Sequence, residues 1–251
     1  MQGNSTSTTK DTRIHKQLLE ASVSAADAAA EIIRGESTHV SSLVWEHKGV
    51  ADFVTRIDRA AESAIAEVLT ANFPDALVIG EELTPDDAVR GTGLEFVVDP
   101  LDGTTNFLPG YPQFAVSIAA IVDGDLVAAT VLNVASDERF TAALGCGAQR
   151  NGVRMQVSSE TRPERALIGT GFPFKRHDLL EEYARQFVRV SRETAGIRRA
   201  GSAALDLADV ACGRFDGFWE LVLAPWDIAA GVLLVREAGG IVTELDGAGK
   251  K

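Results

Sequence analysis

The chain has 251 residues, of which 45% are apolar, enough for one large domain or two small ones with a substantial core. Its formal net charge of −12, with no run of Lys and Arg to offset it, argues against a protein that binds nucleic acid. The polar start lacks the apolar core of a signal peptide, and no apolar run approaches the roughly 18 residues of a membrane span, so we expect a cytoplasmic protein.

Helical and strand-like patterns then follow one another along the chain. Apolar spacing predicts a first helix at residues 11–34, closed by Gly35, and a second at 59–71, closed by Pro74. The segment between them, 52–58, has the pattern of a short strand or turn. Later helices are predicted at 178–192, at 202–211, where the Gly201-Ser202 pair would be the N-cap, and at 226–238.

Strands are predicted at residues 77–79, 96–98, 114–122, 126–134, 138–144, 153–157, 215–221 and 241–244. Asp123-Gly124 and Asn151-Gly152 are typical of hairpin turns between neighbouring strands. Because the first half is antiparallel and the second half alternates, the pattern favours α+β layers over a single wound sheet.

One stretch has a chemical pattern. The apolar strand at 96–98 is followed by Asp99 and Asp102, and then by three residues with spare backbone N–H groups or hydroxyls, Gly103, Thr104 and Thr105. Two carboxylates at a strand end can hold hard cations, and the N–H groups beyond them can receive an anion. A strand, an Asx turn and a capped helix would explain only one of the acids and one of the threonines.

Three other acids lie at similar places. Glu81 follows a predicted strand, Asp58 closes the segment 52–58, and Asp227 lies where a helix begins. Each has an ordinary explanation, since Glu81 could be a loop acid and Asp227 could complement a helix dipole. Together they repeat one arrangement, in which an acid follows the end of a strand or loop and a turn comes next.

Three segments carry a family resemblance: Gly80-Glu81-Glu82, the run from Asp99 to Phe107, and Trp226-Asp227 through Gly231. In order and spacing they resemble the signatures of the inositol monophosphatase family, and the likeness runs from about residue 12 to 247. The resemblance implies a layered α/β/α/β/α sandwich of the sugar-phosphatase type. Before this span, residues 1–11 are expected to form a polar tail. With the resemblance, the chain is expected to have an N-terminal α+β half with the metal motifs at 12–144 and a C-terminal α/β half at 145–251 that lacks the family's last strand and helix.

The resemblance also implies a metal site. Glu81, Asp99 and the Leu101 carbonyl would hold one Mg²⁺, Asp99, Asp102 and Asp227 a second, and a third, weaker ion would lie near Glu81 in some members. The oxygen-only donor set is the one that Mg²⁺ prefers. Thr104, hydrogen-bonded to Asp58, would orient or deprotonate a metal-activated water with the help of Glu81.

The substrate residues follow from the same resemblance. The N–H groups of Gly103 and Thr105 would receive the phosphate oxygens. Asp102, Thr104 and Asp227 would also contact the substrate. Glu220 stands seven residues before Asp227, where inositol-phosphate-hydrolysing members place the acid that binds ring hydroxyls. The lining residues would be Gly201, Ser202 and Ala203, with a further donor from Arg198 or Arg199. Alternatively, Glu220 is a solvated acid at a strand end.

The expected activity is therefore Mg²⁺-dependent hydrolysis of a small phosphorylated polyol, with myo-inositol 1-phosphate as the first candidate. The resemblance further implies inhibition by Li⁺ and a homodimer. The same metal signatures serve fructose-1,6-bisphosphatase, histidinol-phosphatase and 3′-phosphonucleotide phosphatase members. A different class of function, a regulatory binding role on the same fold, also stays open.

Two other patterns suggest different chemistry. Asp123-Gly124-Asp125, after an apolar run, fits the nucleophile motif of haloacid-dehalogenase-type phosphatases, in which the first Asp forms an aspartyl-phosphate. Because another strand-like run follows, we interpret it as a hairpin turn. Gly145-Cys146-Gly147 lacks the third glycine and the helix of a nucleotide loop, so it is also interpreted as a turn. Cys146 and Cys212 lie too far apart in sequence for a zinc motif.

Overall fold

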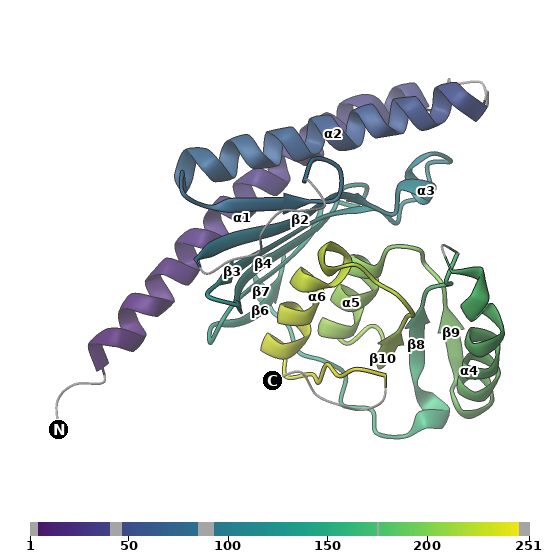
Figure 1. The fold of residues 1–251 in the computed structure, drawn as a ribbon. Helices are drawn as coiled ribbons and strands as arrows, with labels where there is room; N and C mark the ends of the chain where they lie inside the picture. Colours follow the sequence, from purple (N-terminus) through teal and green to yellow (C-terminus); the bar gives the residue numbers. More distant parts are fainter. Residues whose placement is uncertain (1–4, 41–46, 85–92, 175, 246–251) are drawn as a thin grey trace.

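The computed structural model describes residues 5–40, 47–84, 93–174 and 176–245. Its described strands form a seven-stranded sheet in the order β1 to β7 and a three-stranded sheet in the order β10-β8-β9. Two long helices cover the outer face of the large sheet, two helices lie between the sheets, and one helix covers the small sheet (Figure 1). This is the layered α/β/α/β/α sandwich that the family resemblance implied.

The outer helical layer consists of α1 (Ser5–Val40) and α2 (His47–Asn72). Both are longer than predicted: α1 starts within the expected tail and continues through Gly35, and α2 includes the segment 52–58, where we expected a strand or turn. Ile57 is buried four residues before Ala61, which is buried four residues before Ile65, so the end of this segment continues the apolar face of the helix that follows. Gly35 does not end α1 because one internal glycine costs a helix only about 1 kcal/mol.

The large sheet contains β1 (Leu77–Gly80), β2 (Leu94–Asp102), β3 (Ala115–Val122), β4 (Asp125–Asn133), β5 (Glu138–Ala143), β6 (Gly147–Arg150) and β7 (Val153–Arg154). Among the strand pairs that the structure describes in this sheet, only β1–β2 is parallel. Both predicted hairpin turns are confirmed by positive φ values, 50° and 90° at Asp123 and Gly124 and 50° and 77° at Asn151 and Gly152. The sheet continues through β6 and β7, past the boundary expected after residue 144.

The middle layer consists of α5 (Ala203–Ala211) and α6 (Pro225–Glu237), which pack on the inner face of the large sheet. The two helices approach closely, because a Cβ added at Gly231 of α6 would lie 2.5 Å from the Leu207 side chain of α5. Both helices match the predicted ranges to within a residue. No described helix combines the length and the apolar character needed to cross a membrane.

The small sheet consists of three parallel strands, β8 (Leu167–Thr170), β9 (Gly196–Arg198) and β10 (Gly217–Trp219), and α4 (Leu180–Glu193) covers its outer face (Figure 1). Two short 3₁₀ turns, Pro163–Arg165 and His177–Leu179, lie nearby. Two strands are shorter than predicted: only β10 forms within 215–221, and only β7 forms within 153–157. The segment 241–244, predicted as a strand, has no ladder partner among the described residues.

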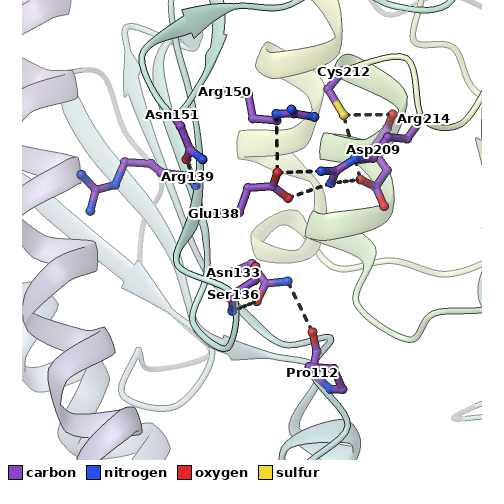
Figure 2. Close-up of polar contacts among 10 residues, drawn as sticks. All are labelled: Pro112, Asn133, Ser136, Glu138, Arg139, Arg150, Asn151, Asp209, Cys212 and Arg214. Atoms are coloured by element: carbon purple, nitrogen blue, oxygen red, sulfur yellow. Dashed lines mark hydrogen bonds and ion pairs between the residues drawn. The ribbon is translucent and has the colours of Figure 1, made fainter.

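A polar bridge ties the far end of α5 to the large sheet (Figure 2). The Arg214 guanidinium donates to both Glu138 carboxylate oxygens of β5, at 2.6 and 2.7 Å, and to Asp209 of α5 at 2.9 Å. Arg150 of β6 also faces Glu138, at 3.5 Å. Bidentate guanidinium–carboxylate pairs fix orientation as well as distance. The bridge therefore holds α5 in a set position over the sheet, and the opposite end of α5 meets the candidate site.

Candidate active site

Asp99 and Asp102 lie at the C-terminal end of β2. The pairing of β2 with β3 shifts register between these two residues, so Pro100, which has no N–H to donate, falls in the irregular step. Asp99 is 2% exposed, and its carboxylate accepts a hydrogen bond from the Leu101 N–H at 3.0 Å. Burial, followed by repulsion from Asp102, Glu81 and Asp227, raises the pKa of Asp99 well above its usual value.

Asp102 connects the sheet to the start of α5. Its Oδ2 accepts hydrogen bonds from the Ser202 hydroxyl and the Ala204 N–H, both at 2.7 Å. Ser202 in turn accepts from the Leu205 N–H, so it is the N-cap that the sequence predicted. Burial raises the pKa of Asp102 to about 7 against these lowering hydrogen bonds, with further repulsion from Asp227 and Glu81.

A tight turn follows, leading into the short helix α3 (Thr104–Phe107). Gly103 has a φ of 92°, and a Cβ there would lie 2.6 Å from the Gln113 carbonyl oxygen, so only glycine fits. The N–H groups at the start of a helix have no partners within that helix. The turn thus places the backbone of Gly103, Thr104 and Thr105 next to the carboxylates, where we predicted a phosphate.

Asp58 approaches this centre from α2. It is 7% exposed, and its Oδ1 has no hydrogen-bond partner among the described residues. Burial, followed by repulsion from Glu82, Glu81 and Glu62, raises the pKa of Asp58 to about 7. The expected Thr104–Asp58 hydrogen bond is wrong for this structure: the Thr104 hydroxyl donates to the Leu101 carbonyl at 2.9 Å, because that acceptor lies within its own turn.

Glu81 and Asp227 complete the acidic set. Glu81 follows β1 directly, and its charge raises the pKa of Asp58, Asp99 and Asp102. Asp227 lies in the first turn of α6, where its carboxylate accepts from the Ala224 N–H at 2.6 Å. Asp227 therefore contacts the start of its own helix, as the ordinary explanation of this residue expects. Its charge also repels Asp99 and Asp102. The two roles do not exclude one another.

Glu220 lies at the end of β10, next to the end of β8. Trp219 pairs with Thr170, and a Cβ added at Gly171 would lie 1.9 Å from a Glu220 carboxylate oxygen. The side chain is partly buried, which disagrees with a solvated acid. Burial and then Asp102 raise the pKa of Glu220 to about 7, while the positive charge of Arg199 lowers it.

Two more residues interact electrostatically with Glu220; the sequence assigned no role to the first and left the second as one of two alternatives. Asp206 of α5 is 1% exposed, its Oδ1 has no hydrogen-bond partner in the described part of the chain, and burial raises its pKa to about 8. Arg199 was named only as one of two possible donors; its guanidinium lies 5.3 Å from the Phe172 ring centroid and 5.0 Å from that of Phe174. The spacing of Asp206 four residues after Ser202, on one helix face, was the available signal.

The donor chemistry of the centre fits a hard cation. Its groups are carboxylates and a carbonyl. Burial, followed by repulsion between the carboxylates, raises the pKa values of Asp58, Asp99 and Asp102. Within the described residues, no three Asp, Glu, His or Cys side chains already form a ready-made metal cluster. Asp102 and Asp227 instead direct an oxygen to the N-termini of α5 and α6.

The competing motif at Asp123 lies apart from this centre. Asp123 is exposed in the β3–β4 turn, where its carboxylate accepts from the Gly93 N–H at 3.0 Å. The predicted Gly145–Gly147 turn is confirmed as well, with φ values of 74° and 83° at its two glycines. Neither segment opens into the helix that its alternative chemistry requires. The interpretation of the first as a hairpin turn and of the second as a turn is therefore confirmed.

Comparison with known proteins points to one family. A family model described as the inositol monophosphatase family matches residues 15–251. A curated Rhizobium meliloti protein named inositol-1-monophosphatase is 46% identical, over 93% of this chain and 87% of its own length. A Pseudomonas aeruginosa protein named Nus factor SuhB is 45% identical, over 92% and 86% of the two chains.

Solved structures agree with these matches. The inositol monophosphatase from Anabaena (Nostoc) sp. PCC 7120 superposes with a TM-score of 0.82 at 36% identity, covering 94% of this chain and 87% of the other. The extragenic suppressor protein suhB from Bartonella henselae, in its native crystal structure, gives a TM-score of 0.82 at 42% identity, covering 92% and 89%. Sequence and fold therefore lead to the same group of proteins.

Proposed function

Because this chain belongs to the inositol monophosphatase family, we propose that it is a Mg²⁺-dependent phosphatase whose substrate is a small phosphorylated polyol, myo-inositol 1-phosphate. The observation that supports this most strongly is the convergence of mutually repelling carboxylates on the turn after β2. Burial and then the charges of Asp102, Glu81 and Asp227 raise the pKa of Asp99, and Asp227 and Glu81 also contribute to the raised pKa of Asp102. A hard cation would relieve that repulsion, and the adjacent backbone N–H groups would receive a phosphate.

The metal assignment follows from the donors present. Glu81, Asp99 and the Leu101 carbonyl would hold one Mg²⁺; Asp99, Asp102 and Asp227 would hold a second, and a third would lie near Glu81. The Leu101 carbonyl has two lone pairs, so its bond from Thr104 leaves one for an ion. When bound, such ions supply the positive charge that activates a water and stabilises the leaving oxygen.

The remaining steps belong to side chains and backbone of this protein. Gly103, Thr104 and Thr105 would bind the phosphate oxygens. Asp58, with an unpartnered oxygen and a pKa of about 7, is suited to receive a proton from the attacking water with Glu81. The Thr104 hydroxyl donates to Leu101, so toward the water it can act only as an acceptor. We therefore assign Thr104 an orienting role.

The polyol would lie on the α5 side of the centre. Glu220 faces Asp102 and Arg199 from the end of β10, and carboxylate oxygens accept strongly from ring hydroxyls. Gly201, Ser202 and Ala203 line the same side, where Ser202 bonds Asp102. A relative named inositol-1-monophosphatase supports this choice over the fructose-1,6-bisphosphatase, histidinol-phosphatase and 3′-phosphonucleotide phosphatase activities.

Inhibition by Li⁺, a homodimeric assembly and a cytoplasmic location complete the proposal as predictions. A second candidate, a regulatory binding role on the same fold, is favoured by relatives that are named Nus factors. The set of ligand acids is complete in this chain, which supports catalysis. It does not exclude a second role.

Glu220→Gln tests the substrate. The variant keeps the shape of the side chain but loses the charge-assisted part of its hydrogen bonds, about 1.5–3 kcal/mol for a charged bond against about 1 for a neutral one. We expect kcat/KM for myo-inositol 1-phosphate to fall about two- to thirty-fold. Hydrolysis of p-nitrophenyl phosphate, which has no polyol hydroxyls, should barely change.

The ratio of the two effects is the quantity to measure, because it cancels any general damage to the metal centre. Equal losses on both substrates would mean that Glu220 supports Asp227 or the fold. No loss on either substrate would mean that the polyol does not contact Glu220, and the sister activities would have to be tested instead.

A further inference from the structure

The turn that carries Glu81 is held from α2 by a buried carboxylate with no role in the proposal above. Glu62 is 2% exposed, and its two oxygens accept from the N–H groups of Glu82 at 2.8 Å and Leu83 at 2.9 Å. Both donors come from the turn that directly follows Glu81. A carboxylate that accepts two backbone N–H groups fixes that backbone in place.

The same carboxylate occupies the space that a side chain at position 80 would need. A Cβ added at Gly80 would lie 2.0 Å from Glu62 Oε1 and 2.6 Å from Oε2. Gly80 does not have a positive φ, so its backbone conformation is open to any residue. The close approach of Glu62, and not backbone strain, therefore accounts for glycine at the start of the turn.

Two further contacts close the turn. The Thr84 hydroxyl accepts from the Gly80 N–H at 2.5 Å, and Arg59 of α2 lies 3.9 Å from the Glu82 carboxylate. Asp58 lies one helical turn before Glu62, on the same side of α2. The helix that carries Asp58 thus also determines where the residue after Gly80 is placed.

We infer that Glu62 is a positioning residue, which sets Glu81 against Asp58 and the β2 carboxylates by holding the backbone of the 80–84 turn. This deepens the proposed function, and rests on it, because Glu81 is taken there to bind Mg²⁺. Residues that orient metal ligands without touching the ion commonly change metal affinity by about 10- to 100-fold when replaced. A carboxylate that only stabilised the fold would leave metal affinity unchanged.

The test is calorimetric titration of Mg²⁺ into the metal-free, full-length protein without substrate. We expect Glu62→Ala to weaken Mg²⁺ binding about 10- to 100-fold, and Glu62→Gln, which keeps one acceptor oxygen, to weaken it less. In the same metal-free proteins, amide hydrogen exchange at Glu82 and Leu83 should become faster in Glu62→Ala. That second readout does not depend on any metal.

Glu237 offers a matched control. Its carboxylate also accepts two backbone N–H groups of a turn, from Gly145 at 3.0 Å and Gly147 at 2.7 Å, but in the β5–β6 connection. Glu237→Ala should lower the melting temperature and leave Mg²⁺ affinity as it is in the unaltered protein. Similar losses of Mg²⁺ affinity in both variants would reduce Glu62 to a general stabilising role.

Gly80→Ala tests the same contact from the other side and serves if Glu62→Ala does not fold. The added methyl group must displace Glu62, so Gly80→Ala alone should weaken Mg²⁺ binding. When Gly80→Ala is combined with Glu62→Ala, Mg²⁺ affinity should change little beyond the loss in Glu62→Ala. Fully additive losses, or unchanged Mg²⁺ affinity in Glu62→Ala and Gly80→Ala, would overturn the positioning role and leave the proposed function intact. If the unaltered protein binds no Mg²⁺, both proposals fall together.

Discussion

Asp99→Asn is expected to lower kcat at least about 10²-fold, and Asp227→Asn to do the same, because each removes a ligand charge that supports several kcal/mol of transition-state stabilisation. The melting temperature of the metal-free protein should not fall in Asp99→Asn. Asp99 is buried among like charges, and a neutral amide of the same shape removes that repulsion. Loss of activity with retained stability is the combination that identifies a ligand.

Asp123→Asn is the control for these variants. Asparagine tolerates the positive φ of 50° that Asp123 has in its hairpin turn, so stability and kcat should stay near those of the unaltered protein. Steady-state kinetics with saturating Mg²⁺ would compare the three variants. An inactive but normally folded Asp123→Asn protein, beside active Asp99→Asn, would favour an aspartyl-phosphate mechanism.

Mg²⁺ should raise the melting temperature, and the increase should be larger at pH 8 than at pH 5.5. Burial and like charges raise the pKa of Asp58 and Asp102 to about 7 in the folded protein, against about 4 for an unfolded carboxyl. Between these values the folded state binds more protons, so the stability of the metal-free protein falls as pH rises through this window. Mg²⁺ replaces those protons, and its stabilising effect therefore grows with pH.

Calorimetric melting of the protein at pH 5.5, 7 and 8, with and without millimolar Mg²⁺, would measure both trends. Asp206→Asn is a useful control, because Asp206 has a raised pKa of about 8 but no assigned metal contact. It should raise the metal-free melting temperature at pH 8 and keep the increment due to Mg²⁺. A metal-free protein that grows more stable from pH 5.5 to pH 8 would be inconsistent with the repulsion described here.

Features specified by a few neighbouring residues were predictable from sequence. The hairpin at Asp123-Gly124 and the N-cap at Ser202 depend on local backbone geometry and one nearby hydrogen bond, and both are found where expected. Long apolar runs identified β3 and β4 for the same reason. The order of layers was implied by the family resemblance and not by these patterns alone.

Features decided by distant contacts were harder to predict. β8, β9 and β10 have only three or four residues each and exist through parallel pairing between segments far apart in sequence. The buried role of Glu62 depends on a turn about 20 residues later. The Thr104 hydroxyl donates to the Leu101 carbonyl in its own turn and not to Asp58. Residue types alone do not decide which of two possible acceptors a hydroxyl uses.

Phosphate release from myo-inositol 1-phosphate by the purified protein, measured with millimolar Mg²⁺, after exhaustive EDTA treatment and after Mg²⁺ is restored, tests the proposed function most directly. Fructose-1,6-bisphosphate, histidinol phosphate and 3′-phosphoadenosine 5′-phosphate should be compared in the same assay. We expect kcat/KM to be highest for the inositol phosphate, activity to disappear on chelation, and Mg²⁺ to restore it. Undiminished hydrolysis after chelation would contradict the metal-dependent mechanism, and faster hydrolysis of another ester would contradict the proposed substrate.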